Sequence, residues 1–121
     1  MHEAARSADA VAASQVAYSE VRAILARGRR AKRFTDRDVA VARMLLDSRW
    51  VNVAKVPVDE AVGLQAGEIA GRHALRALDA IHVASAASLL DGGQQIVFAS
   101  FDRDQRDGAR QEGLALFPES L

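Results

Sequence analysis

Apolar residues recur along most of the chain at the three- and four-residue spacing of an amphipathic helix. This spacing predicts helices over residues 14–32, 36–49 and 75–90, with Ser14 and Thr35 as the N-caps of the first two. The side chains expected to face inward on those two helices are Val16, Ala17, Val21, Ile24, Leu25, Val39, Ala42, Leu45 and Leu46. A fourth helix is expected where acids occupy the first turn and glycines weaken the rest, over residues 58–71.

Short apolar runs of the kind that form β-strands lie between these helices. Residues 95–100, "QIVFAS", are uninterrupted, as in a strand buried on both faces of a parallel sheet. A short helix is expected after it, from about 103 to 112. Other strands are expected at 9–13, 50–58 and 114–118. Because strands alternate with helices and no hairpin signal occurs, the pattern predicts an α/β fold with a mainly parallel sheet.

Composition narrows the class of protein. A chain of 121 residues can bury one core, so we expect a single domain over residues 1–121. The sequence contains no cysteine, which excludes a disulfide framework and a thiolate metal site. No apolar run approaches the length of a membrane span and no signal-peptide pattern opens the chain. A cytoplasmic protein with no membrane segment is therefore expected.

Charge is balanced overall but uneven along the chain. The net charge is zero. Between Arg22 and Arg37 there is one acid, Asp36, against seven basic residues: Arg22, Arg27, Arg29, Arg30, Lys32, Arg33 and Arg37. Arginine forks pair with phosphate, so an RNA or DNA backbone is one possible target. A solvated helix end, where cations complement the helix dipole, explains the run equally well.

Acidic residues interrupt three of the apolar stretches. Glu20 lies on the expected inward stripe of its helix, and Asp79 lies between Leu75 and Val83 in the same way. Asp102 follows the buried strand directly, and Asp104 lies just beyond it. In open α/β sheets, sites form at the carboxyl ends of the strands, and flanking helices can deliver side chains to that edge.

Carboxylates that gather without basic partners repel one another, so either their pKa values rise or a cation holds them. Oxygen ligands without cysteine or a paired histidine motif suit Mg²⁺ or Mn²⁺. Each acid also has a structural explanation that does not involve a metal site. Asp102 with Gln105 fits a capping box, Glu20 can reach an arginine on another element, and Asp79 can pair with His82.

Three blocks of the sequence, in order and spacing, resemble PIN-domain ribonucleases, and among them the VapC-type toxins of toxin–antitoxin pairs. The blocks are "SQVAYSEVRAIL" (14–25), "LRALDAIHVASA" (75–86) and "VFASFDRDQRDGARQEGLALFP" (97–118). The second block is the most specific, and the resemblance covers nearly the whole chain.

The resemblance implies a Rossmann-like three-layer sandwich and an endoribonuclease that depends on Mg²⁺ or Mn²⁺. The acidic site of the family maps onto Glu20, Asp79 and Asp102, with Asp104 as an accessory metal ligand. The family also implies an RNA substrate, a homodimer, and a cognate antitoxin whose tail covers the acidic groove. A phosphate-binding receiver domain is a weaker alternative, because it needs a lysine late in the chain and the only lysines are Lys32 and Lys55.

One part of the family pattern is missing. PIN domains open with a hydrophobic strand that ends in a metal-binding aspartate, whereas "MHEAARSADAVAAS" looks like the end of the first helix running into the second strand. Asp9 precedes a strand and is not assigned to the site. We therefore expect an N-terminally incomplete fold, and three explanations stand: a misplaced start, a truncation, or a strand supplied by another chain. The alternative function is a catalytically impaired PIN remnant that binds antitoxin or RNA without cleaving.

Overall fold

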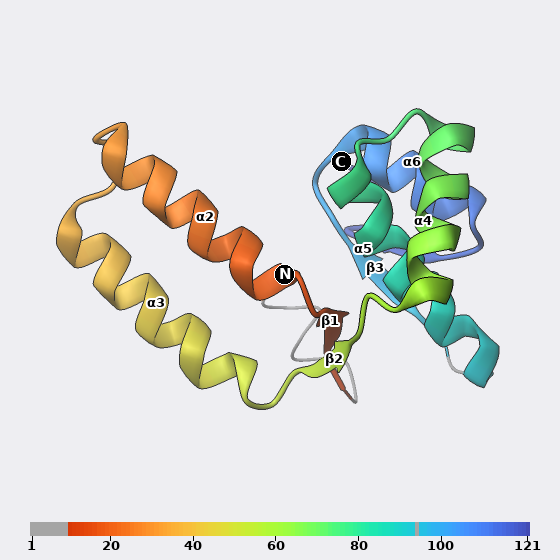
Figure 1. The fold of residues 1–121 in the computed structure, drawn as a ribbon, viewed down its shortest axis with the longest axis horizontal. Coiled ribbons are helices and arrows are strands. Elements are labelled where there is room, and N and C mark those ends of the chain that lie inside the picture. The colour runs from red at the N-terminus through yellow and green to blue at the C-terminus, as the bar shows by residue number, and fades with distance from the viewer. Residues whose placement is uncertain (1–9, 94) are drawn as a thin grey trace.

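The computed structural model describes residues 10–93 and 95–121, and its elements alternate between short strands and longer helices (Figure 1). In chain order these are β1 (Ala12–Ser14), α2 (Ala17–Arg30), α3 (Asp36–Trp50), β2 (Ala54–Val56), α4 (Glu60–His73), α5 (Ala77–Ser88), the 3-10 helix η1 (Leu89–Gly92), β3 (Val97–Ala99), α6 (Arg103–Gln111) and β4 (Ala115–Phe117). The predicted α/β class is confirmed. The expected strand at 9–13 is found as Ala12–Ser14, and Asp9 lies outside the described residues.

All strand pairs in the described chain are parallel, and they form two separate sheets of two strands each. β1 pairs with β2, with Ala13 opposite Lys55, and β3 pairs with β4, with Phe98 opposite Leu116. The prediction that β3 is buried on both faces was wrong, because Val97 is 52% exposed. A two-stranded sheet leaves β3 at an edge, where only part of each strand can be covered. The single domain over residues 1–121 and the missing strand stay predictions.

In the part of the chain that the structure describes, the buried residues of the hydrophobic core lie between 62 and 114, where α4 and α5 pack closely against each other. Ile69 and Val83 are fully buried at its centre, and α6 and β4 close it from the other side. The remaining core residues are Val62, Ala66, Leu75, Ala80, Ala84, Ala109 and Leu114. Small side chains dominate this set, which lets the helix backbones approach one another closely.

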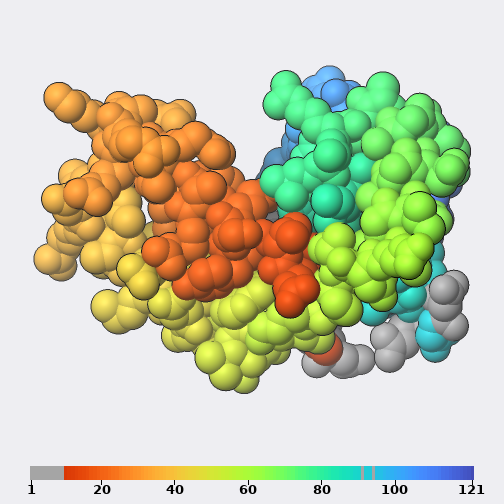
Figure 2. Space-filling model, in the orientation of Figure 1, coloured from red at the N-terminus to blue at the C-terminus, as the bar shows by residue number. Residues whose placement is uncertain are grey.

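The helices α2 and α3 form an arm that projects from the body, with β1 and β2 between the arm and α4–α6 (Figure 1). Figure 2 shows the arm as a separate lobe, with a recess between it and the side that carries α5 and α6. At the base of the arm, the Tyr18 and Trp50 rings lie 5.7 Å apart and the Tyr18 hydroxyl donates to Asp47 at 2.6 Å. These contacts fix the two helices to each other where the arm leaves the body.

The arm buries less than its apolar pattern predicted. Val21, Ile24 and Leu45, all expected to face inward, are exposed, and no residue of α3 is buried. An apolar stripe shows which face a helix can bury, but burial also needs a neighbouring element that covers that face. In a two-helix arm, each helix has only the other to cover it, so part of each stripe stays exposed. The predicted Thr35 cap is confirmed, since Thr35 and Asp38 form a complete capping box. Ser14 ends β1 instead of capping α2, and its hydroxyl accepts from the Val16 amide at 3.3 Å.

A partly buried ionic cluster joins the end of α4 to the end of α6. The Glu112 carboxylate contacts His73 Nε2 at 2.7 Å and accepts from Arg72 at 3.0 Å, and the side chain of Glu112 is only 12% exposed. Burial alone would raise the pKa of Glu112, but the hydrogen bonds from His73 and Arg72 outweigh it and hold that pKa below its ordinary 4.5.

We expect the substitution Glu112→Gln to destabilise the fold by about 1–3 kcal/mol near neutral pH, because it removes charge-assisted hydrogen bonds from a largely buried site. A carboxylate whose pKa is lowered by folding stabilises the protein above its ordinary pKa and loses this contribution as pH falls through the folded value. The difference between wild type and variant should therefore shrink as the pH falls below the ordinary 4.5 and through the lowered pKa of Glu112. Denaturant unfolding at several pH values measures this, and a difference that stays constant with pH would contradict it.

Candidate active site

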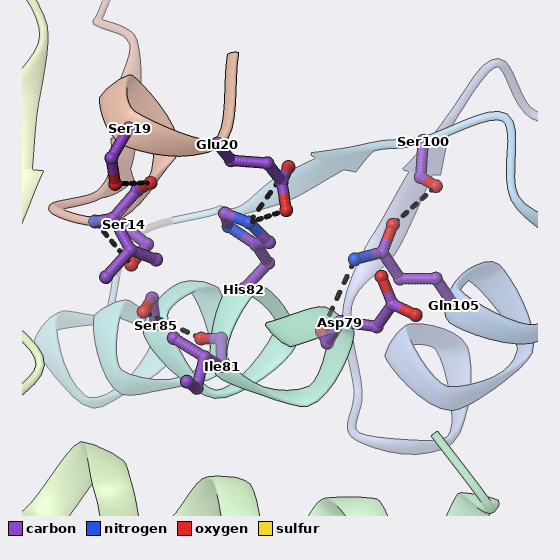
Figure 3. Close-up of polar contacts among 10 residues, drawn as sticks. Ser14, Ser19, Glu20, Asp79, Ile81, His82, Ser85, Ser100 and Gln105 are labelled. Carbon is purple, nitrogen blue, oxygen red and sulfur yellow. Dashed lines mark hydrogen bonds and ion pairs between the residues drawn. The ribbon is translucent and has the colours of Figure 1, made fainter. Parts of the chain in front are cut away.

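Glu20 lies in the first turn of α2, the helix that follows the carboxyl end of β1, and it contacts α5 through His82. The two Glu20 oxygens are 3.3 and 3.4 Å from His82 Nε2, across a separation of 62 residues (Figure 3). The Glu20 side chain is 30% exposed and that of His82 is 17% exposed. The alternatives in which Glu20 pairs with an arginine, or His82 with Asp79, do not match these contacts. His82 therefore orients the Glu20 carboxylate at the junction of α2 and α5.

Asp79 lies in the first turn of α5 and is half-buried. Its backbone carbonyl accepts a hydrogen bond at 3.3 Å from the amide nitrogen of Gln105, and the amide oxygen of Gln105 accepts from the Ser100 hydroxyl at 2.8 Å. Figure 3 shows Asp79 and Gln105 side by side, with Ser100 beyond them. Gln105 therefore connects the start of α5 to the segment between β3 and α6.

Asp102 is the N-cap of α6, so the N-cap part of the structural explanation for this residue is confirmed. The Asp102 carboxylate accepts a hydrogen bond from the backbone N–H of Gln105 at 2.8 Å. The backbone N–H of Asp102 donates to the Ser100 hydroxyl at 3.1 Å. This departs from a true capping box, because the Gln105 side chain turns away to Asp79. Asp102 is exposed, and a cap uses only one carboxylate oxygen, so its second oxygen has no hydrogen bond within the described chain.

Asp104 is exposed in the first turn of α6. It lines a shallow polar hollow beside the end of α4, together with Arg72, His73, Asp107 and Gln111. Its surroundings therefore differ from those of Glu20, and within the described chain it has no ion pair. The accessory role expected for Asp104 stays a prediction.

The structure connects Glu20 of α2 to α5 through His82, places Asp79 on α5 itself, and joins Asp79 to Asp102 through Gln105. It does not gather all these carboxylates at one point. Over residues 10–93 and 95–121, no three acidic or histidine side chains are close enough together to hold a metal ion. The chemistry of the donors suits a hard cation such as Mg²⁺ or Mn²⁺, because they are carboxylates without thiolates. The metal-binding roles of Glu20, Asp79, Asp102 and Asp104 stay predictions.

Sequence reasoning missed three of the side chains that shape this region. Spacing pointed to His82 only as a partner of Asp79 and to Gln105 only as part of a cap, and it did not single out Ser100. Glu20 and His82 are too far apart along the chain for spacing to reveal their contact. Ser100 did offer a signal, because it is a polar residue at the end of the apolar run 96–99 and lies two residues before Asp102.

The fold, the acids near the carboxyl ends of β1 and β3, and the connecting helix α5 define a class of protein, and comparison with known families identifies it. The pattern of the PIN domain matches residues 2–111, so the chain belongs to the PIN-domain family. Two similar curated proteins come from Mycobacterium tuberculosis: ribonuclease VapC45 of strain CDC 1551 / Oshkosh and ribonuclease VapC49 of strain ATCC 25618 / H37Rv. Each is 37% identical over 113 residues, which is 93% of this chain and 77% of the relative. The resemblance found in the three sequence blocks is thereby confirmed.

Proposed function

We propose that this protein is an endoribonuclease and the toxin component of a toxin–antitoxin pair, hydrolysing RNA phosphodiester bonds with Mg²⁺ or Mn²⁺. The observation that carries the proposal is the placement of three acids around α5 in a chain related to two named ribonucleases. Glu20 reaches α5 through His82, Asp79 belongs to α5, and Asp102 is joined to it through Gln105.

Each residue has a definite part in this proposal. Glu20, Asp79 and Asp102 would hold the cation, with Asp104 as an accessory ligand. When bound, a divalent cation neutralises phosphate charge and makes water a better nucleophile. His82 orients the Glu20 carboxylate, and Gln105 fixes the start of α5 relative to the N-cap of α6. Such positioning matters because misplacing a catalytic group by about 1 Å can cost about 100-fold in rate.

We also propose two protein partners, a second copy of the chain and a cognate antitoxin, in addition to the RNA substrate. The large exposed apolar residues of α3 support this: Val41 is 45% exposed, Met44 68% and Leu45 49%. Contiguous exposed apolar surface of this kind marks protein contact sites.

No helix of the described chain is long and apolar enough to cross a membrane. A cytoplasmic location is part of the proposal.

The direct test incubates the chain with a labelled structured RNA in Mn²⁺, in Mg²⁺ and with a chelator. We expect cleavage fragments with either metal and none with the chelator. Restoring excess Mn²⁺ to the chelated sample should restore cleavage, which controls for damage by the chelator. Fragments that persist in the chelator would contradict the metal dependence, and their absence in every sample would contradict the nuclease.

A second candidate function is an impaired PIN domain that binds antitoxin or RNA without cleaving. The observation that favours it is that the described residues bring no three metal-binding side chains together. This candidate predicts that RNA binding is the same in Mn²⁺ and in chelator while no fragments appear. The cleavage assay above therefore separates the two candidates.

A further inference from the structure

Six cations gather at the end of the arm that is farthest from the body, on the last turn of α2, the connecting turn and the first turn of α3. We call this surface the basic tip; it consists of Arg27, Arg29, Arg30, Lys32, Arg33 and Arg37, all exposed. Two acids in the same stretch, Asp36 and Asp38, leave a local charge of +4 in a chain of zero net charge. The positive charge is thus concentrated at one end of the molecule.

Local structure explains only half of these cations. Arg27, Arg29 and Arg30 lie in the last turn of α2, where positive charge is favourable to the helix dipole. Arg37 is the second residue of α3, where the dipole disfavours positive charge. Lys32 has φ of +60°, a conformation that glycine adopts more readily at the end of a helix. Residues that oppose the local rules are the ones for which a function should be sought.

Neither acid neutralises the tip as a whole. Asp36 pairs with Arg29 at 2.6 Å, and Asp38 is held by the capping box with Thr35. The backbone hydrogen bond from Thr35, followed by that of its side chain, holds the pKa of Asp38 below its ordinary value. Within the described chain, Arg30, Lys32, Arg33 and Arg37 have no salt bridge.

The turn that carries these cations is well fixed. Both the Arg33 and the Phe34 amides donate to the Gly28 carbonyl, at 2.9 and 3.2 Å. The Phe34 ring packs directly on Gly28, at a position where any larger residue would collide with it. The cations are therefore presented by a defined turn, so fewer backbone conformations are lost when a ligand binds.

We propose that the basic tip binds the phosphate backbone of the RNA substrate. This inference rests on the proposed ribonuclease function. A protein partner would need an apolar centre for its interface, and in the described chain the large exposed apolar residues stop at Ile24 and resume at Val41. A nucleic-acid backbone, in contrast, can be bound by cations alone. Five of the six cations of the basic tip are arginines, whose guanidinium groups match the geometry of phosphate.

The tip acts on binding and not on the chemical step. Arg30 is ten residues beyond Glu20 on the same helix, a rise of about 15 Å. Backbone contacts at that distance position an RNA without reading its sequence. Their loss should raise KM and leave kcat unchanged.

The test compares wild type with the triple variant Arg30→Gln, Arg33→Gln, Arg37→Gln, which keeps Lys32 and the Arg29–Asp36 pair. The control Arg43→Gln, Arg49→Gln, Arg110→Gln removes the same charge from other exposed positions. Fluorescence anisotropy with a 20-nucleotide labelled RNA, in chelator so that nothing is cleaved, gives Kd at several salt concentrations. Circular dichroism melting checks that both variants are folded.

We expect the tip variant to bind RNA about 10- to 100-fold more weakly, with the slope of log affinity against log salt reduced by about 2, while the control changes little. Equal losses in both variants would attribute the effect to net charge and overturn the proposal. Capture of a poly-glutamate peptide by the tip, with RNA binding unchanged in the variant, would overturn it in favour of an acidic protein partner.

The two proposals can fail separately. Because binding is measured in chelator, tip-dependent binding without any cleavage by the wild type would refute the nuclease and leave the basic tip standing. Cleavage by the wild type with no difference between the tip variant and the control would refute the basic tip alone.

Discussion

The substitution Asp79→Asn should lower RNA cleavage by about 100- to 1000-fold, the range seen when one electrostatic contact to a transition state is removed. Asparagine keeps the shape of the side chain but not its charge. The backbone carbonyl of residue 79 can still accept from Gln105, so the start of α5 should keep its position. A loss of this size would therefore report on the carboxylate itself. Initial rates in Mn²⁺ measure it.

The matched control is Asp107→Asn, which removes one carboxylate from the exposed face of α6; over the described residues, Asp107 has an ion pair with Arg110 alone. Exposed pairs of this kind contribute little, so cleavage by the control should match wild type. Melting curves confirm that both variants fold. If Asp79→Asn cleaves as fast as Asp107→Asn, Asp79 has no part in catalysis, and the proposed acidic site is wrong.

The substitution Ile69→Ala should destabilise the fold by about 2–5 kcal/mol, the range for large-to-small changes in a core. Ile69 is 0% exposed and lies where α4 meets α5, so the lost methyl groups leave a cavity lined by side chains that are already close-packed. The free energy of unfolding of a domain is about 5–15 kcal/mol, so this single change could remove a large part of it. Urea unfolding followed by circular dichroism measures it.

Leu64→Ala is the control for Ile69→Ala, because Leu64 lies on the same helix and is 67% exposed. Its truncation should change the free energy of unfolding by less than about 0.5 kcal/mol. Similar losses for the two variants would mean that α4 does not bury the face assigned to it.

The sequence was informative where local rules decide the structure. Helical periodicity located the helices, and the Thr35 and Asp102 caps were predicted from residue type and spacing alone. It was misleading about burial: Ile24 and Leu45 belong to apolar stripes and are exposed, because a stripe does not reveal whether another element covers it. A PIN-type site was expected at three acids, but spacing could not foresee how those acids are held.

Those holding contacts depend on tertiary structure. His82 reaches Glu20 across 62 residues, and Gln105 reaches the Asp79 carbonyl across 26. Each contact is made by a polar residue whose type fits several structural roles. Only the position of α2 and α6 relative to α5 in the folded chain selects the partner that His82 and Gln105 find.

The confinement of the core to residues 62–114 has a consequence for cooperativity. Amides of α4 and α5 are protected by close packing, so they exchange with solvent only when the whole fold opens. The amides of α2 and α3 are protected by a ring pair, a capping box and few buried side chains, so they can exchange through local opening of the arm. A ligand that binds the arm would slow the exchange of the α2 and α3 amides first. Hydrogen exchange of these amides would therefore show whether the ligand is bound.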